Sequence, residues 1–125
     1  MKIQIIDDNN DIQAIYEGLF TEAGYEVKVS GDGLVGIEDV VEFKPDIVLL
    51  DILMPEMSGY DFLQALRKST SVSPLVIVCS NLSEQIDIDR ALRAGAHFYL
   101  RKSDFVGKNL VQEVDRLYTS RLSQK

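Results

Sequence analysis

The stretch Asp46-Ile47-Val48-Leu49-Leu50-Asp51 places an uninterrupted apolar run between two carboxylates. A run without polar alternation is typical of a parallel strand that is covered by helices on both faces of its sheet. An ionised aspartate is costly to bury without a partner, so we expect Asp51 at the point where this strand leaves the sheet. In open parallel sheets, ligands and chemistry gather at the carboxyl ends of the strands. Asp51 is therefore the first candidate functional residue.

Four other segments are predicted strands, and helical patterns lie between them. The expected strands cover residues 3–6, 25–29, 75–79 and 97–100. After each strand, including the one before Asp51, apolar residues recur at helical spacing. Ser83 is the expected N-cap of the fourth helix, and Gly24, Pro45 and Gly95 follow helix ends.

This alternation of strand and helix, repeated five times with short connections, predicts an α/β fold with a parallel sheet and helices on both faces. Continuous apolar runs place the first, third and fourth strands at the centre, and the alternating segment 25–29 at an edge. The pattern favours the flavodoxin-like, doubly wound (βα)5 fold with strand order 2-1-3-4-5. We assign residues 1–122 to this domain and 123–125 to a polar tail.

Composition narrows the class of protein. The 125 residues carry a net charge of −7, which argues against non-specific binding to nucleic acid or to an anionic membrane surface. No apolar run is long enough for a membrane span, and the first residues lack a signal-peptide pattern. The single Cys79 has no internal disulfide partner, and its apolar neighbours indicate a buried thiol. We expect a cytoplasmic protein.

Polar residues stand at the carboxyl ends of four predicted strands: Asp7 and Asp8, then Asp51, Ser80 and Lys102. In the order 2-1-3-4-5 the first and third strands are neighbours, so three carboxylates converge. Their mutual repulsion would raise at least one pKa unless a cation is present. All-oxygen sites suit Mg²⁺, which readily shares a phosphate oxygen.

One carboxylate with an open side, together with a metal, a hydroxyl and a lysine, suits phosphoryl transfer to Asp51. Carboxylate nucleophiles form aspartyl phosphates as covalent intermediates. The metal and Lys102 would neutralise charge on the transferring group, and Ser80 could donate a hydrogen bond to it.

This set of residues, in this order, resembles the receiver domain of two-component response regulators, in particular the stand-alone chemotaxis type. The resemblance covers the chain from Ile3 to about Leu122. It rests on the acidic pair Asp7-Asp8, the segment Asp51-Ile52-Leu53-Met54-Pro55 with Gly59, Ser80 after an apolar strand, and Lys102.

The resemblance implies a role for each acidic residue. Asp51 would be the phosphoacceptor. Asp8 and Asp51 would bind Mg²⁺ directly, together with the backbone carbonyl of Leu53, and Asp7 would act through water. Such a domain catalyses only its own phosphorylation and dephosphorylation, so we do not class it as an enzyme.

The resemblance also implies a switch and partners. Ser80 and Tyr99 would form the switch pair, with the hydroxyl moving toward the phosphoryl group while the ring turns inward. The phosphoryl donor would be a sensor histidine kinase or a phosphotransfer protein. Output would pass through the fourth helix, fifth strand and fifth helix to a protein whose identity is open, a second copy of this chain included.

Four positions depart from the family's usual pattern or tune its chemistry. Ser103 stands where the family usually has proline after the lysine, and we expect a trans bond there because a cis bond would cost about 2.5–4 kcal/mol. Asn81 replaces a small residue and could contact or crowd the phosphoryl group. Leu53 and Leu82, two residues past Asp51 and Ser80, lie at positions that tune phosphate lifetime, and we expect them to slow dephosphorylation.

Other interpretations remain open. Asp7 and Asp8 could simply cap the first helix, Lys102 could be solvated surface, and Tyr99 could be a core aromatic. The chain could be a receiver-like interaction module that no longer accepts phosphate. An enzyme on a similar sheet is disfavoured: the loop after the first strand lacks the phosphate-binding pattern of a flavodoxin, and Leu53 stands where an aspartate-based phosphatase needs a second acid. We expect His97 to be structural.

Overall fold

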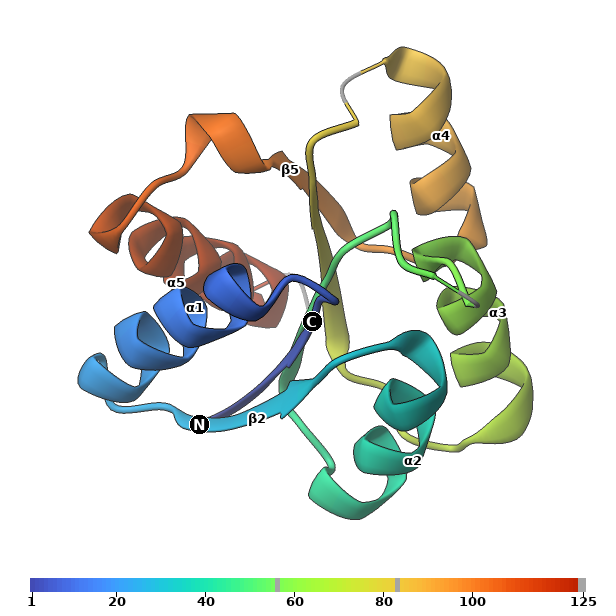
Figure 1. Cartoon of the computed structure of the whole chain (residues 1–125), viewed down its shortest axis with the longest axis horizontal. Helices are drawn as coiled ribbons and strands as arrows, with labels where there is room; N and C mark the ends of the chain where they lie inside the picture. The colour runs from blue at the N-terminus through green and yellow to red at the C-terminus, as the bar shows by residue number, and fades with distance from the viewer. Residues whose placement is uncertain (56, 83, 124–125) are drawn as a thin grey trace.

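The computed structural model describes residues 1–55, 57–82 and 84–123. It contains one sheet of five parallel strands in the order β2-β1-β3-β4-β5, which confirms the predicted fold (Figure 1). The strands are β1 (Lys2–Ile6), β2 (Glu26–Ser30), β3 (Ile47–Leu50), β4 (Leu75–Ser80) and β5 (Phe98–Arg101). The helices are α1 (Asn10–Glu22), α2 (Gly33–Phe43), α3 (Gly59–Ser69), α4 (Gln85–Ala94) and α5 (Lys108–Ser123).

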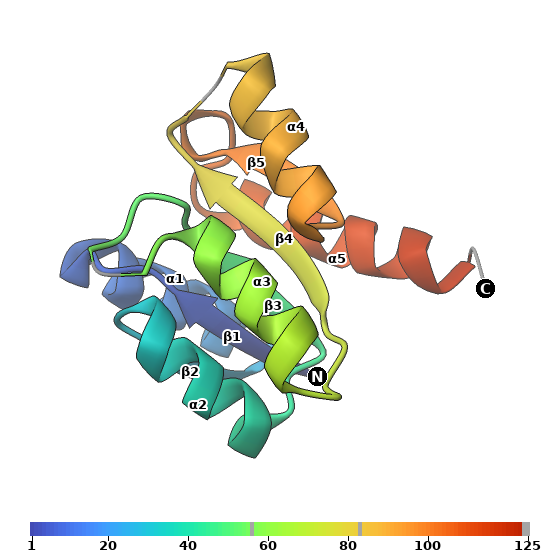
Figure 2. The same ribbon diagram turned by 90° about the vertical axis from the view of Figure 1, so that its right-hand side faces the viewer.

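The helices form two layers, one on each face of the sheet. Helices α1 and α5 cover one face, where Phe20 and Leu110 are fully buried against alternate residues of the strands. Helices α2, α3 and α4 cover the other face, where Val40, Phe62 and Ala91 are buried (Figures 1 and 2). Two cores therefore enclose the sheet and fix the directions in which its strand ends point.

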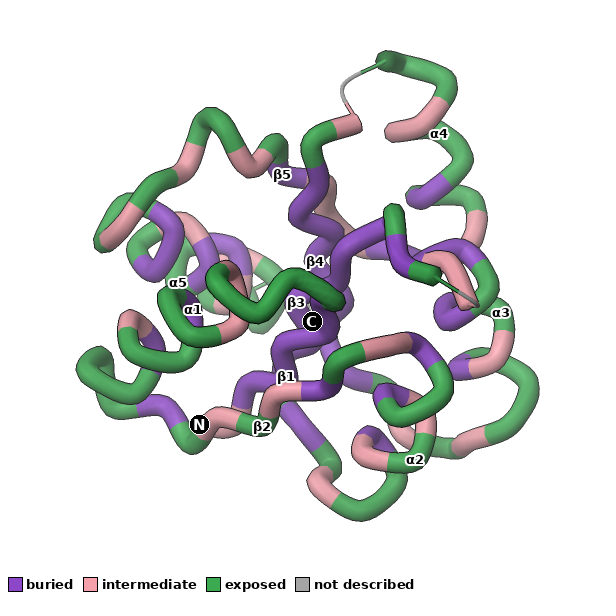
Figure 3. The backbone as a smooth tube through the Cα atoms, in the orientation of Figure 1, coloured by how far each residue is buried: buried purple, intermediate pink, exposed green. Residues whose placement is uncertain are grey.

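Burial along the strands explains their order. Every residue of β3 and β4 is buried, and β1 is buried from Ile3 onward, as expected for strands with helices on both faces (Figure 3). Strand β2 alternates between exposed and partly buried residues up to its last residue. The alternating strand lies at the edge, as its sequence predicts.

Local signals set the helix ends. The side chains of Asn9, Asp32 and Ser58 accept backbone N–H groups of the first turns of α1, α2 and α3. Gly95 follows α4 with a φ of 121°, a backbone conformation that favours glycine. Ser83, the expected N-cap of the fourth helix, lies outside the described residues.

Several strand boundaries differ by one residue from the expected ones. Tyr25 and His97 precede β2 and β5 rather than belonging to them. A short 3-10 turn, Lys102–Asp104, follows β5, and no peptide bond among the described residues is cis, as expected at Ser103. Helix α5 reaches Ser123, and residues 124–125 of the proposed tail are not described.

Within the described ranges, no helix is both long and apolar enough to cross a membrane.

Candidate functional site

The acidic residues converge because β1 and β3 pair in parallel and end together. Ile6 pairs with Leu50, and the N–H of Asp51 donates to the carbonyl of Ile6 at 2.9 Å. Asp7 and Asp51 therefore leave the sheet side by side, with Asp8 one residue further on. One carboxylate oxygen from each of these three aspartates lies within 4.8 Å of the others. The predicted cluster is thus present.

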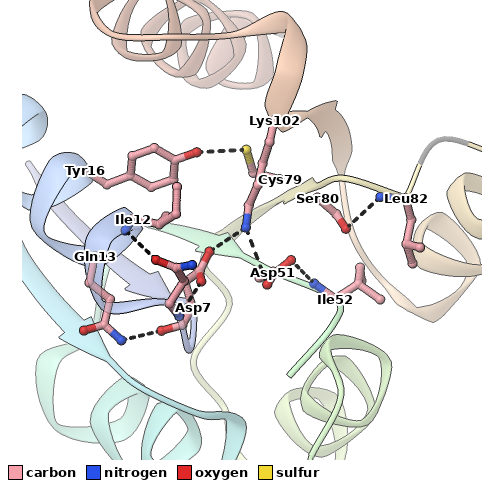
Figure 4. A network of polar contacts seen from close by, with 11 residues as sticks. Asp7, Ile12, Gln13, Tyr16, Asp51, Ile52, Cys79, Ser80, Leu82 and Lys102 are labelled. Carbon is pink, nitrogen blue, oxygen red and sulfur yellow. Dashed lines mark hydrogen bonds and ion pairs between the residues drawn. The ribbon is translucent and has the colours of Figure 1, made fainter. Parts of the chain in front are cut away.

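Lys102 completes this cluster from the end of β5 (Figure 4). Its Nζ lies 2.8 Å from Oδ2 of Asp7 and 3.5 Å from Oδ2 of Asp51. Burial lowers the pKa of Lys102, but the hydrogen bond with Asp7 and the charges of Asp51 and Asp7 outweigh it and raise the pKa overall. The lysine therefore stays charged between two carboxylates, and it is not a solvated surface residue.

Asp51 is a buried carboxylate in an unfavourable electrostatic position. Only 7% of the residue is exposed. Burial, with a further contribution from the charge of Asp7, raises its pKa to about 6, although Lys102 and the N–H of Ile52 favour the charged form. That N–H donates to Oδ1 of Asp51 at 2.9 Å. One lysine does not fully compensate the negative charge gathered here.

A hard divalent cation fits this donor set. The three aspartates supply only oxygen ligands, which suit Mg²⁺, and a cation would offset the burial and the charge of Asp7 that together raise the pKa of Asp51.

The two neighbouring acids on β1 differ in what their oxygens already bind. Oδ1 of Asp7 accepts the N–H of Asn9 at 2.9 Å, and its Oδ2 accepts Lys102. Asp7 is buried, whereas Asp8 is exposed. Asp8 is thus the more accessible of the two carboxylates, and Asp7 is held in place by its partners.

Ser80 and Tyr99 meet at Leu82. Ser80 is fully buried at the end of β4, and its Oγ accepts the N–H of Leu82 at 3.3 Å. Tyr99 is half-buried on β5, and its hydroxyl donates to the carbonyl of Leu82 at 2.6 Å. Both side chains therefore hold Leu82, the second residue after β4.

The remaining predicted positions differ in how far they are exposed. Leu53 is 60% exposed, and Leu82 is partly buried against the core beneath α2, α3 and α4. Asn81 and Ser103 are exposed. The role of the Leu53 carbonyl as a metal ligand stays a prediction.

Two contacts at the site were not foreseen from the sequence. Nε2 of Gln13 donates to the carbonyl of Asp7 at 2.6 Å, and the hydroxyl of Tyr16 lies 3.8 Å from Sγ of the buried Cys79 (Figure 4). No pattern marks Gln13, because a polar residue on a helix is ordinarily solvated. Gly59 belongs to the segment that carries the family resemblance, and the structure adds a steric reason for it: a Cβ there would lie 2.6 Å from the carbonyl oxygen of Asp51. Glycine at this position lets α3 begin directly beside the acidic residue.

Comparisons with known proteins agree with this geometry. A family model described as the response regulator receiver domain matches residues 3–115. The chain is 35% identical to the chemotaxis protein CheY of Thermotoga maritima, over 81% of this chain and 84% of that protein. It is 32% identical to the DNA-binding response regulator MtrA of Mycobacterium leprae, over 90% of this chain but only 49% of that protein. The chain thus spans about half the length of that relative.

Solved structures give the same result. The receiver domain of the Francisella response regulator 1452 is 28% identical, covers 96% of this chain and 98% of its own, and has a TM-score of 0.84. A CheY-like receiver domain protein from Methanospirillum hungatei has a TM-score of 0.87 over 99% of this chain and 98% of its own. Its identity of 21% shows likeness of fold alone.

Proposed function

Because the chain belongs to the family of response regulator receiver domains, we propose that Asp51 is its phosphoacceptor. Receiver domains are phospho-accepting signalling modules rather than conventional enzymes, and they interact with histidine kinases or phosphotransfer proteins. One observation carries the assignment of the residue: Asp51 lies between Asp7, Asp8 and Lys102 at the end of a central strand.

In the transfer itself, the Asp51 carboxylate acts as the nucleophile. An oxygen of Asp51 forms a bond to phosphorus while the bond from phosphorus to the donor histidine nitrogen breaks, and the electron pair stays on the imidazole. The carboxylate must be ionised to attack, and its raised pKa means that part of the metal-free population is protonated near neutral pH. Positive charge at the site therefore favours the reactive form.

Asp8 and Asp51 would hold a Mg²⁺ ion, with the carbonyl of Leu53 as a third protein ligand and Asp7 acting through water. When bound, the ion supplies positive charge that stabilises the transferring phosphoryl oxygens. Lys102 supplies a second positive charge, held ready by Asp7 at 2.8 Å. Asp7 is in this respect a positioning residue for the lysine.

Phosphorylation would be read out through Ser80 and Tyr99. A phosphoryl group on Asp51 adds acceptor oxygens near the Ser80 hydroxyl. If that hydroxyl turns to donate to them, it gives up its place beside Leu82, to which Tyr99 is also bonded. The segment from β4 to α4 would move, and with it the face formed by α4, β5 and α5, where we place the downstream protein partner.

Intact mass spectrometry tests this function. The protein is incubated with acetyl phosphate, with and without Mg²⁺, beside an Asp51→Asn variant. We expect one added phosphoryl group, only with the metal and only in the wild type. No gain of mass under any condition would favour a phosphorylation-independent interaction module, and attention would turn to Asn81 and Ser103.

A further inference from the structure

A concave site lies at the end of the sheet opposite Asp51. It is a cleft of about 720 Å³ at the amino end of β4, bounded by the last turns of α3 and α5 and by the start of β5. Figure 2 shows the C-terminal end of α5 and the connection from α3 to β4 at the same end of the molecule. The cleft shares no lining residue with the acidic cluster.

The charge of this cleft is opposite to that of the whole chain. Arg67 and Arg121 line it from two different helices, in a protein whose net charge is −7. Among the described residues of the lining, Asp46 is the only acid, and its Oδ2 already accepts the backbone N–H of Lys2 at 2.8 Å. Neither arginine has an ion-pair partner within the described ranges.

The side chain of Arg67 packs against Gly95, the glycine that follows α4. A Cβ at Gly95 would lie 3.2 Å from Cδ of Arg67, so the arginine stem lies against the bare backbone there. Its Nη1 donates to the carbonyl of Ala94 in a long contact of 3.5 Å. This single contact leaves the other guanidinium N–H groups available to a ligand.

His97 adds a neutral donor to the lining of the cleft. Its Nδ1 accepts the N–H of Val76 at 3.0 Å, so the proton of the neutral ring lies on Nε2. Burial and the nearby charge of Arg121 lower the pKa of His97, in agreement with a neutral ring close to that arginine.

We propose that this cleft binds a small ligand through an oxyanion group, a carboxylate or a phosphate, held by Arg67 and Arg121 with His97 as a further hydrogen-bond donor. Guanidinium groups recognise both oxyanions through paired N–H bonds. The volume is that of a small-molecule site, and Leu66 and Val72 offer apolar contact to the body of the ligand.

A simpler function for the two arginines is to compensate the negative ends of α3 and α5, since each lies in the last turn of its helix. That function accounts for a positive charge on each helix. It does not require both charges to line one cleft with a histidine donor and a single, already bonded acid. Ligand binding separates the two explanations.

The test is an NMR titration of the ¹⁵N-labelled protein with pyrophosphate and, separately, with citrate, at constant ionic strength and without Mg²⁺. We expect saturable chemical-shift changes at Val76, Gly95 and His97 with at least one of the two anions. The dissociation constant should be at least tenfold lower than that for chloride. Pyrophosphate and citrate distinguish a phosphate ligand from a carboxylate ligand. Shifts that grow linearly with both anions, or that match those of chloride, would overturn the proposal.

Variants locate the site. Arg67→Gln combined with Arg121→Gln should weaken binding at least tenfold, whereas Arg93→Gln combined with Arg116→Gln, which removes the same charge outside the cleft, should leave it unchanged. Arg67→Lys combined with Arg121→Lys keeps the charge but loses the guanidinium fork, and should also weaken binding. Equal weakening by the cleft and control pairs would contradict the assignment. The outcome does not depend on phosphorylation of Asp51.

Discussion

Lys102 is bonded to Asp7 rather than to Asp51: its Nζ lies 2.8 Å from Asp7 and 3.5 Å from Asp51. Asp7 thus fixes the lysine, and Asp51 keeps an oxygen less tightly bound. Lys102 thus makes its stronger contact with Asp7, which is not expected to react. Its positive charge is held in position beside Asp51, which is expected to react.

Replacing Lys102 with Met tests this pairing. Asp7 is only 3% exposed, so the change leaves a buried carboxylate without its cation. We expect a loss of about 1–3 kcal/mol in the free energy of unfolding, measured with urea in metal-free buffer. Mg²⁺ should recover part of the loss. Unchanged stability would mean that water already solvates Asp7 and that the lysine does not hold it.

Replacing Asp51 with Asn should stabilise the metal-free protein at pH 7. Burial raises the pKa of this carboxyl to about 6, so the ionised form is disfavoured in the folded state. With allowance for solvent screening, we expect a gain of about 1–2 kcal/mol in the free energy of unfolding. Added Mg²⁺ should stabilise the wild type more than the variant. Equal Mg²⁺ effects on the two proteins would argue against Asp51 as a ligand.

Tyr99→Phe removes the hydrogen bond to the carbonyl of Leu82, which is 2.6 Å long. Because the segment after β4 loses one of its two anchors, its amide hydrogens should exchange faster. Overall stability should fall by about 0.5–1.5 kcal/mol. Tyr118→Phe on α5 is the matched control and should leave this segment unchanged. Equal exchange in both variants would remove Tyr99 from the proposed switch.

His97 makes stability depend on pH. Burial and Arg121 hold its pKa below the usual value, so protonation favours the unfolded chain. The stability that the neutral ring contributes is complete above the unfolded pKa of about 6.5 and is lost as the pH falls below it. Urea unfolding at several pH values should therefore show that the stability of the wild type, relative to that of His97→Asn, falls as the pH is lowered. Asparagine keeps a hydrogen-bond acceptor but does not titrate in this range. A constant difference would contradict the lowered pKa.

Polar replacements at Leu53 and Leu82 should shorten the phosphate lifetime. Leu53 is 60% exposed two residues past Asp51, and Leu82 is partly buried two residues past Ser80. At these positions we expect the two apolar side chains to hinder an attacking water. Leu53→Asn with Leu82→Asn should speed loss of the phosphoryl group several-fold, followed by intact mass after removal of the donor. Leu92→Asn on the exposed side of α4 serves as a control. An unchanged rate would refute this role of the two leucines.

The sheet and the acidic cluster could be predicted from the sequence because both depend on simple patterns of apolar and polar residues along the strands. The continuous run before Asp51 and the alternation in 25–29 specify central and edge strands, and strand order then brings Asp7 and Asp51 together. The partner of Lys102 could not be predicted in the same way, since it depends on where a flexible side chain comes to rest among three carboxylates. The contact of Gln13 with Asp7 and the cleft beside Arg67 depend on tertiary packing between segments distant in sequence.

The most direct measurement identifies the residue that carries the phosphoryl group. The phosphorylated protein is treated with borohydride, which reduces an aspartyl phosphate to homoserine, and its peptides are sequenced by mass spectrometry. We predict homoserine at position 51, with Asp7 and Asp8 unchanged. Homoserine at position 7 or 8, with Asp51 intact, would contradict the assignment of Asp51 as the phosphoacceptor.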